Sequence, residues 1–74
     1  MTRVLMVRHR HRPNAVTSAV SLAEALKDRG IDVVDDASCG DIDMVLSIGG
    51  DGTFLVAASS ARALGVPLRG INAG

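Results

Sequence analysis

Short apolar runs alternate with stretches of helical periodicity, and this alternation constrains the fold more than any other feature of the chain. The run Val4–Val7 is continuously apolar between charged residues, and Met44–Ile48 contains only one polar residue. Such runs are typical of strands that are buried on both faces of a parallel sheet. Further runs at Ile31–Val34 and Leu68–Ile71 predict two more strands.

Two helices are predicted between these strands, because apolar residues recur there at three- and four-residue spacing. The first follows Pro13, with Asn14 as its N-cap and Gly30 at its carboxyl end, and the second ends at Gly65. Their predicted core faces comprise Val16, Ala19, Val20, Ala23 and Leu26, and Phe54, Ala57, Ala58, Ala61 and Leu64. The order strand, helix, strand, strand, helix, strand indicates an open, mostly parallel α/β sheet with flanking helices.

The composition argues against several classes of function. The chain has 74 residues, 47% hydrophobic and 22% charged, which favours one small folded domain over a disordered chain. A formal net charge of zero gives no field to attract polyanions or anionic membranes, and a single aromatic residue, Phe54, provides no stacking platform for nucleic acid. The first apolar run is too short for a signal peptide, and the one cysteine forms no internal disulfide. We therefore expect a cytoplasmic protein without nucleic-acid or membrane partners.

A short basic run is the local exception to this neutral balance. Arg8, Arg10 and Arg12 alternate with His9 and His11. The run is either a solvated strand end and loop or a segment that faces an anionic ligand such as a nucleotide. No Cys, Asp or Glu lies close enough in sequence to complete a metal site with the two histidines, so no metal ligands are assigned.

A glycine-rich segment carries the clearest chemistry. Gly49, Gly50 and Gly52 surround one carboxylate, Asp51, between a predicted buried strand and a helix start, where backbone amides converge on an anion. A carboxylate beside phosphate is repelled unless it holds a metal ion or accepts a proton, so Asp51 is either a general base or part of a Mg²⁺ site. The alternative is a tight turn in which Asp51 or Thr53 caps the helix. The segment is neither a Walker A loop nor Gly-x-Gly-x-x-Gly.

The second half of the chain resembles the amino-terminal domain of NAD kinases. Gly-Gly-Asp-Gly-Thr alone is shared with the wider superfamily of diacylglycerol, sphingosine and 6-phosphofructokinases. Phe54-Leu55 directly after the loop and Ile71-Asn72-Ala73-Gly74 after the last predicted strand narrow the resemblance. The first half, from Val4 to Asp36, is similar to the family in layout more than in motif.

This resemblance implies phosphorylation of the adenosine ribose 2′-hydroxyl of NAD to give NADP. ATP or polyphosphate would be the donor, with Mg²⁺ or another divalent cation. Asp51 would be the catalytic carboxylate and would contact NAD together with Gly52, while Gly49, Gly50 and Thr53 shape the loop around the phosphates. Asn72 either contacts the nucleotide or caps a turn. We expect the full-length protein to be a homo-oligomer.

The sequence also departs from the family pattern. Val56 stands where several family members carry an Arg that can reach the nucleotide. The family continues past Gly74 with a larger β-rich domain that holds most of the NAD site, so we expect residues 1–74 to be an incomplete amino-terminal nucleotide-binding domain, inactive and poorly stable alone. A non-catalytic nucleotide-binding module remains an alternative. A lipid kinase of the same superfamily is another, although its Pro-x-Gly-Thr pattern is absent after the fourth predicted strand.

Overall fold

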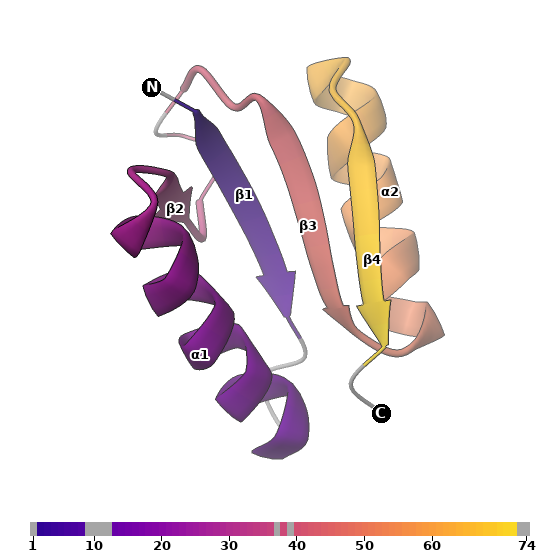
Figure 1. The fold of residues 1–74 in the computed structure, drawn as a ribbon. Helices are drawn as coiled ribbons and strands as arrows, with labels where there is room; N and C mark the ends of the chain where they lie inside the picture. The colour runs from indigo at the N-terminus through magenta and orange to yellow at the C-terminus, as the bar shows by residue number, and fades with distance from the viewer. Residues whose placement is uncertain (1, 9–12, 37, 39, 73–74) are drawn as a thin grey trace.

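The computed structural model describes residues 2–8, 13–36, 38 and 40–72. In this part of the chain, four strands form one parallel sheet flanked by two helices (Figure 1). The elements are β1 (Arg3–Arg8), α1 (Pro13–Asp28), β2 (Asp32–Val34), β3 (Met44–Gly49), α2 (Asp51–Leu64) and β4 (Leu68–Asn72). The strands lie where the sequence predicted them to within a residue, α2 begins three residues earlier than predicted, and the predicted open, mostly parallel α/β sheet is confirmed.

The strand order is β2-β1-β3-β4, with every pair parallel. The crossover from β1 to β2 and the crossover from β3 to β4 run outward in opposite directions. Because such crossovers are right-handed, α1 and α2 lie on opposite faces of the sheet (Figure 1). The chain changes direction between β1 and β3, and in open α/β sheets ligands bind beyond the carboxyl ends of the strands at this switch point.

Two apolar layers form the core, one on each face of the sheet. Around Ala19 of α1 pack the buried residues Val4, Met6, Leu46 and Ile48. On the other face the buried cluster comprises Leu5, Ile42, Val45, Ala57 and Ala61. Alternate residues of β1 and β3 therefore face opposite helices, which explains why both strands are continuously apolar.

Both helices end at a glycine in the left-handed conformation. Gly30 has a φ of 80°, its N–H donates to the Lys27 carbonyl, and the N–H of Ile31 donates to the Leu26 carbonyl. This pair of bonds is a Schellman motif, which satisfies carbonyls that the helix itself leaves free. The same arrangement ends α2 at Gly65, whose φ is 68°. Both carboxyl-terminal glycines were predicted correctly.

The predicted beginning of α1 and parts of both core faces were wrong. The helix begins at Pro13, so Asn14 lies in its first turn and is not the N-cap; proline suits the first helical position because its φ is fixed and its missing N–H would have no intrahelical partner. Val20, Phe54 and Leu64 are exposed. The buried residues of α2 are instead Thr53, Ala57 and Ala61, whose small side chains allow the helix to lie close to the sheet. Val16 has a side chain outside the described part of the structure.

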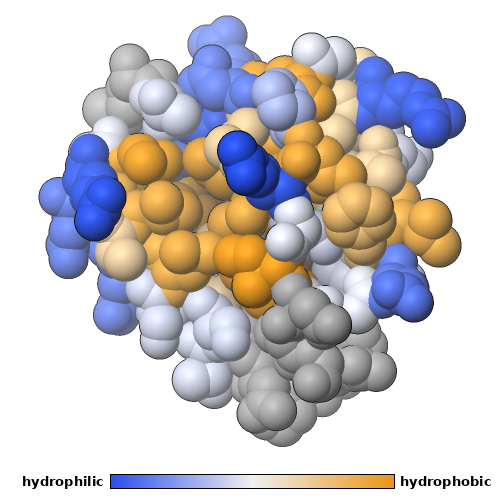
Figure 2. All heavy atoms as spheres, turned by 45° about the vertical axis from the view of Figure 1, so that its right-hand side comes forward, coloured by the Kyte–Doolittle hydropathy of each residue, from blue (hydrophilic) through white to orange (hydrophobic). Residues whose placement is uncertain are grey.

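The face of β3 and β4 on the α1 side carries an apolar groove. Its volume is about 340 Å³. The lining residues are Ser18, Ser21, Leu22, Ala25, Ile48 and Ile71. Figure 2 shows hydrophobic residues gathered on this side of the molecule. The groove lies beside β4 because α1 packs mainly over the β1 side of the sheet.

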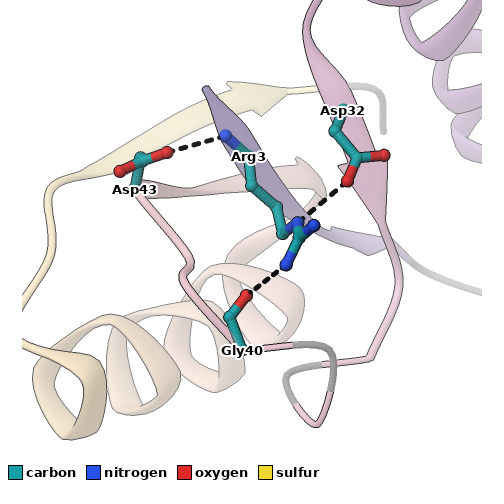
Figure 3. A network of polar contacts seen from close by, with 4 residues as sticks. All are labelled: Arg3, Asp32, Gly40 and Asp43. Atoms are coloured by element: carbon teal, nitrogen blue, oxygen red, sulfur yellow. Dashed lines mark hydrogen bonds and ion pairs between the residues drawn. The ribbon is translucent and has the colours of Figure 1, made fainter. Parts of the chain in front are cut away.

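Arg3 ties the loop before β3 to the amino-terminal end of the sheet. Its backbone N–H donates to the Asp43 carboxylate at 2.8 Å, its Nε pairs with Asp32 at 2.8 Å, and its Nη1 donates to the Gly40 carbonyl at 2.8 Å (Figure 3). These contacts bridge β1, β2 and the loop. They lie at the edge of the sheet opposite the carboxyl ends of the strands.

Candidate functional site

The predicted glycine loop is shorter in the structure, because α2 begins within it. β3 ends at Gly49, Gly50 is the N-cap residue in an extended conformation, and the helix begins at Asp51. The N–H of Phe54 donates to the Gly50 carbonyl at 3.0 Å, which is the first bond of the helix. The backbone N–H groups that precede Phe54 have no partner within the helix, so they form an electropositive helix start.

No side chain caps this helix start. The alternative in which Asp51 or Thr53 acts as the N-cap is therefore wrong, because Gly50 occupies that position and both residues belong to the first helical turn. The Asp51 side chain is exposed. It is the acidic residue of that turn, where its charge interacts favourably with the helix dipole.

Gly49 and Thr53 are fitted closely to each other. Gly49 has a φ of 150°, and a Cβ built on it would lie 2.8 Å from Oγ1 of Thr53. Thr53 is only 9% exposed. Its side chain therefore packs under the loop against Gly49 at the end of β3. Gly52 has no heavy atom near the position of a Cβ, so the space in front of it is open.

A pocket of about 210 Å³ lies between the end of β3, the start of α2 and β4. Its lining residues are Ser47, Gly49, Gly50, Asp51, Phe54, Gly70 and Ile71. Sequence reasoning placed the loop residues here but assigned Phe54 to the core and overlooked Ser47 and Gly70. A glycine inside a strand often marks a close approach of another group, and this signal could have identified Gly70.

The other predicted site residues lie at the same edge of the sheet. Asn72 ends β4 and is the register partner of Gly49, so its backbone lies beside the loop, although its side chain is outside the described part. Arg8 ends β1 opposite Ile48 and is exposed. The remainder of the basic run, residues 9–12, lies outside the described residues, as does Cys39.

The described residues contain no group of three or more His, Cys, Asp or Glu side chains that could hold a metal ion. Asp51 is thus the carboxylate that the loop itself can offer to a cation. Mg²⁺ is commonly bound by one or two carboxylates together with substrate phosphates and water, and a single exposed carboxylate beside a helix start without a side-chain cap fits that mode.

Comparison with known proteins identifies the family of the chain. Residues 38–74, which include β3, the loop, α2 and β4, match the ATP-NAD kinase N-terminal domain family. The chain belongs to this family. Its match covers the region on which the resemblance to NAD kinases was based, and the resemblance is thereby confirmed.

Several curated NAD kinases are similar to this chain. The NAD kinase of Corynebacterium diphtheriae is 36% identical over 96 residues, which is 97% of this chain and 30% of the relative. That of Bacteroides fragilis is 62% identical over 34 residues, or 46% of the chain and 12% of the relative. That of Rhodococcus jostii is 56% identical over 39 residues, or 53% of the chain and 12% of the relative. No solved structure matches.

Two further observations concern α2 and the lengths of the helices. Val56, at the position where several family members carry Arg, is exposed on α2 and brings no charge there. Among the described residues, no helix is both long enough and apolar enough to cross a membrane.

Proposed function

We propose that the full-length protein is an NAD kinase that phosphorylates the adenosine ribose 2′-hydroxyl of NAD and so produces NADP. Membership of the ATP-NAD kinase N-terminal domain family and the names of the similar proteins support this function. The observation that carries the proposal is the position of Asp51. It is a carboxylate in the first turn of α2, beside the switch point of a parallel sheet.

The start of α2 is suited to binding phosphate groups. The N–H groups of Asp51, Gly52 and Thr53 belong to the first turn of α2 and precede the first intrahelical bond, so they have no partner within the helix. Gly52 leaves the approach to these groups open, and Gly49 permits the sharp passage from β3 to α2. These residues, with Asn72 at the end of β4, are the proposed contacts of NAD and of the ATP or polyphosphate donor.

Asp51 is the proposed catalytic carboxylate. In the proposed reaction, the bond between the 2′-oxygen of NAD and the terminal phosphorus forms while the bond to the donor's leaving oxygen breaks. The proton of the 2′-hydroxyl passes to the Asp51 carboxylate. In the alternative role, Asp51 would instead hold a divalent cation that neutralises part of the charge of the donor phosphates. The exposed position of Asp51 at the rim of the pocket leaves room for both ligands.

The proposal concerns the full-length protein, because the chain spans at most 30% of the relatives described above. Residues outside these 74 would complete the NAD site, so the isolated chain is expected to be inactive. The full-length enzyme is expected to act in the cytoplasm as a homo-oligomer that uses NAD and ATP.

The activity is tested by incubating the full-length protein with NAD, Mg²⁺ and either ATP or polyphosphate. NADP is then measured with an NADP-specific dehydrogenase, and a diacylglycerol substrate is assayed in parallel. Formation of NADP with turnover supports the proposal. Binding of NAD and ATP without turnover would identify a non-catalytic nucleotide-binding module, and phosphorylation of the lipid alone would identify a lipid kinase.

A further inference from the structure

Two adjacent side chains of α2 lie against two glycines in neighbouring strands. Thr53 packs on Gly49 of β3, and Phe54 packs on Gly70 of β4. A Cβ built on Gly70 would lie 2.9 Å from both Cδ1 and Cε1 of the Phe54 ring, so the ring occupies the place of the missing side chain. Only glycine at position 70 allows the ring to sit this close to the strand.

The contact between Phe54 and Gly70 belongs to the loop rather than to the core. Phe54 is 43% exposed and is absent from both buried clusters. It follows Asp51 by three residues, which places both side chains on one side of the helix, and both line the pocket together with Gly70. An aromatic ring at this position joins the first turn of α2 directly to β4.

We propose that Phe54 is a positioning residue for phosphoryl transfer, acting through its contact with Gly70. The ring fixes the start of α2 against β4, and thereby fixes Asp51 and the amides of the first turn relative to the end of the sheet. The contact complements that of Thr53, which holds the same turn against β3. This inference rests on the proposed NAD kinase function.

The arrangement has a definite consequence for catalysis. A group that transfers a proton must be held close to its productive geometry, and a displacement of about 1 Å can reduce a rate by about 10²-fold. If Phe54 positions Asp51, its loss lowers kcat by a larger factor than it raises KM, because the groups that bind substrate remain present although displaced. If Phe54 only covers apolar surface, its loss lowers thermal stability and leaves the kcat of the folded enzyme unchanged.

The test uses Phe54→Leu, Gly70→Ala and the double variant in the full-length protein. Each single variant is expected to lower kcat by about tenfold or more, with KM for NAD and ATP changed less than about threefold. Because both substitutions disrupt one contact, the double variant should be no slower than the slower single variant, and leucine should relieve the clash created by alanine. Leu64→Ala is the matched control. Leu64 is similarly exposed at the far end of α2, and this variant should retain the parental kcat.

Full kcat in Phe54→Leu would overturn the proposal, and so would single effects that multiply in the double variant. Amide hydrogen exchange at position 54, whose N–H donates to the Gly50 carbonyl, provides a readout that does not depend on activity. Exchange should accelerate in both single variants and no further in the double variant. Should the parent protein lack NAD kinase activity, the proposed function fails, and the exchange data alone decide whether the contact positions the first turn; unchanged exchange in the single variants would refute it.

Discussion

The side chain of Thr53 fills the space that a Cβ at Gly49 would need, with Oγ1 2.8 Å from that position. This relationship joins the last residue of β3 to the first turn of α2. It sets how closely the helix start approaches the sheet, and therefore where Asp51 and the free amides of that turn lie. The geometry of the proposed phosphate site thus depends on the close fit between Gly49 and the Thr53 side chain.

Gly49→Ala is expected to destabilise the protein. The new methyl group would clash with Thr53, and the φ of 150° is strained for a residue with a Cβ. Overpacking of this kind costs about 1–3 kcal/mol. Urea unfolding of the full-length protein measures the loss, and adding Thr53→Ala should recover part of it. An alanine at position 49 that leaves the free energy of unfolding unchanged would show that the close fit is unimportant.

Gly52→Ala is expected to separate stability from ligand binding. A Cβ at this helical position meets no neighbouring atom, and alanine in a helix is about 1 kcal/mol more favourable than glycine. The free energy of unfolding should therefore hold or rise. The methyl group would nevertheless stand beside the amides proposed to bind phosphate, so affinity for ATP should fall in titration calorimetry. Undiminished ATP affinity would place the phosphate elsewhere.

Arg3→Met is expected to weaken the amino-terminal edge of the sheet without affecting catalysis. The change removes the side-chain bonds to Asp32 and Gly40, whereas the backbone bond to Asp43 can persist. Because the pair is partly exposed, the expected loss is at most about 1 kcal/mol. The loss should shrink at high salt, since salt screens the ion pair. A large fall in turnover for this variant would contradict the separation between this edge and the site.

The Asp36 carboxyl offers a test of the loop before β3. The backbone N–H of Ser38 donates to it at 2.9 Å, and this bond, with a smaller contribution from the Ser38 side chain, lowers the pKa of Asp36 below its usual range. A pKa lowered in the folded state adds stability above the unfolded pKa, which is lost as the pH falls through the folded value. NMR titration should find the lowered pKa, and Ser38→Gly should raise it only in part. An Asp36 pKa in the usual range for Asp would contradict the hydrogen bond from the Ser38 N–H.

Much of the fold could be predicted because its strands carry continuous apolar runs. Residues such as Val45 and Leu46 face opposite helices, so burial on both sides leaves a clear pattern. The ends of the two helices at Gly30 and Gly65 could also be predicted, because glycine adopts the positive φ of a helix end at little cost. The strand order could not be predicted, because nothing in residues 35–43 indicates that the chain passes from β2 across β1 to β3.

The residues of the candidate site were predicted in part, and the error in the predicted position of Phe54 has a physical cause. Periodicity placed Phe54 in the core because its spacing matches Ala57 and Ala61. The helix instead packs on the sheet through Thr53, Ala57 and Ala61. Phe54 therefore lies beside this buried face, at the pocket and against Gly70. The register that places Asn72 beside Gly49 depends on pairing between strands, which hydrophobic spacing alone does not specify.

The most direct test of the proposed function is the turnover of Asp51→Asn in the full-length protein. Asparagine keeps the size of the side chain but removes its charge and basicity, so kcat for NADP formation should fall by about 10²- to 10⁴-fold. NAD affinity, measured by calorimetry, should change little. Asp35→Asn, which removes an exposed carboxylate just after β2, serves as the matched control and should keep the parental kcat. Turnover of Asp51→Asn within a few fold of the parent would contradict the catalytic role of Asp51.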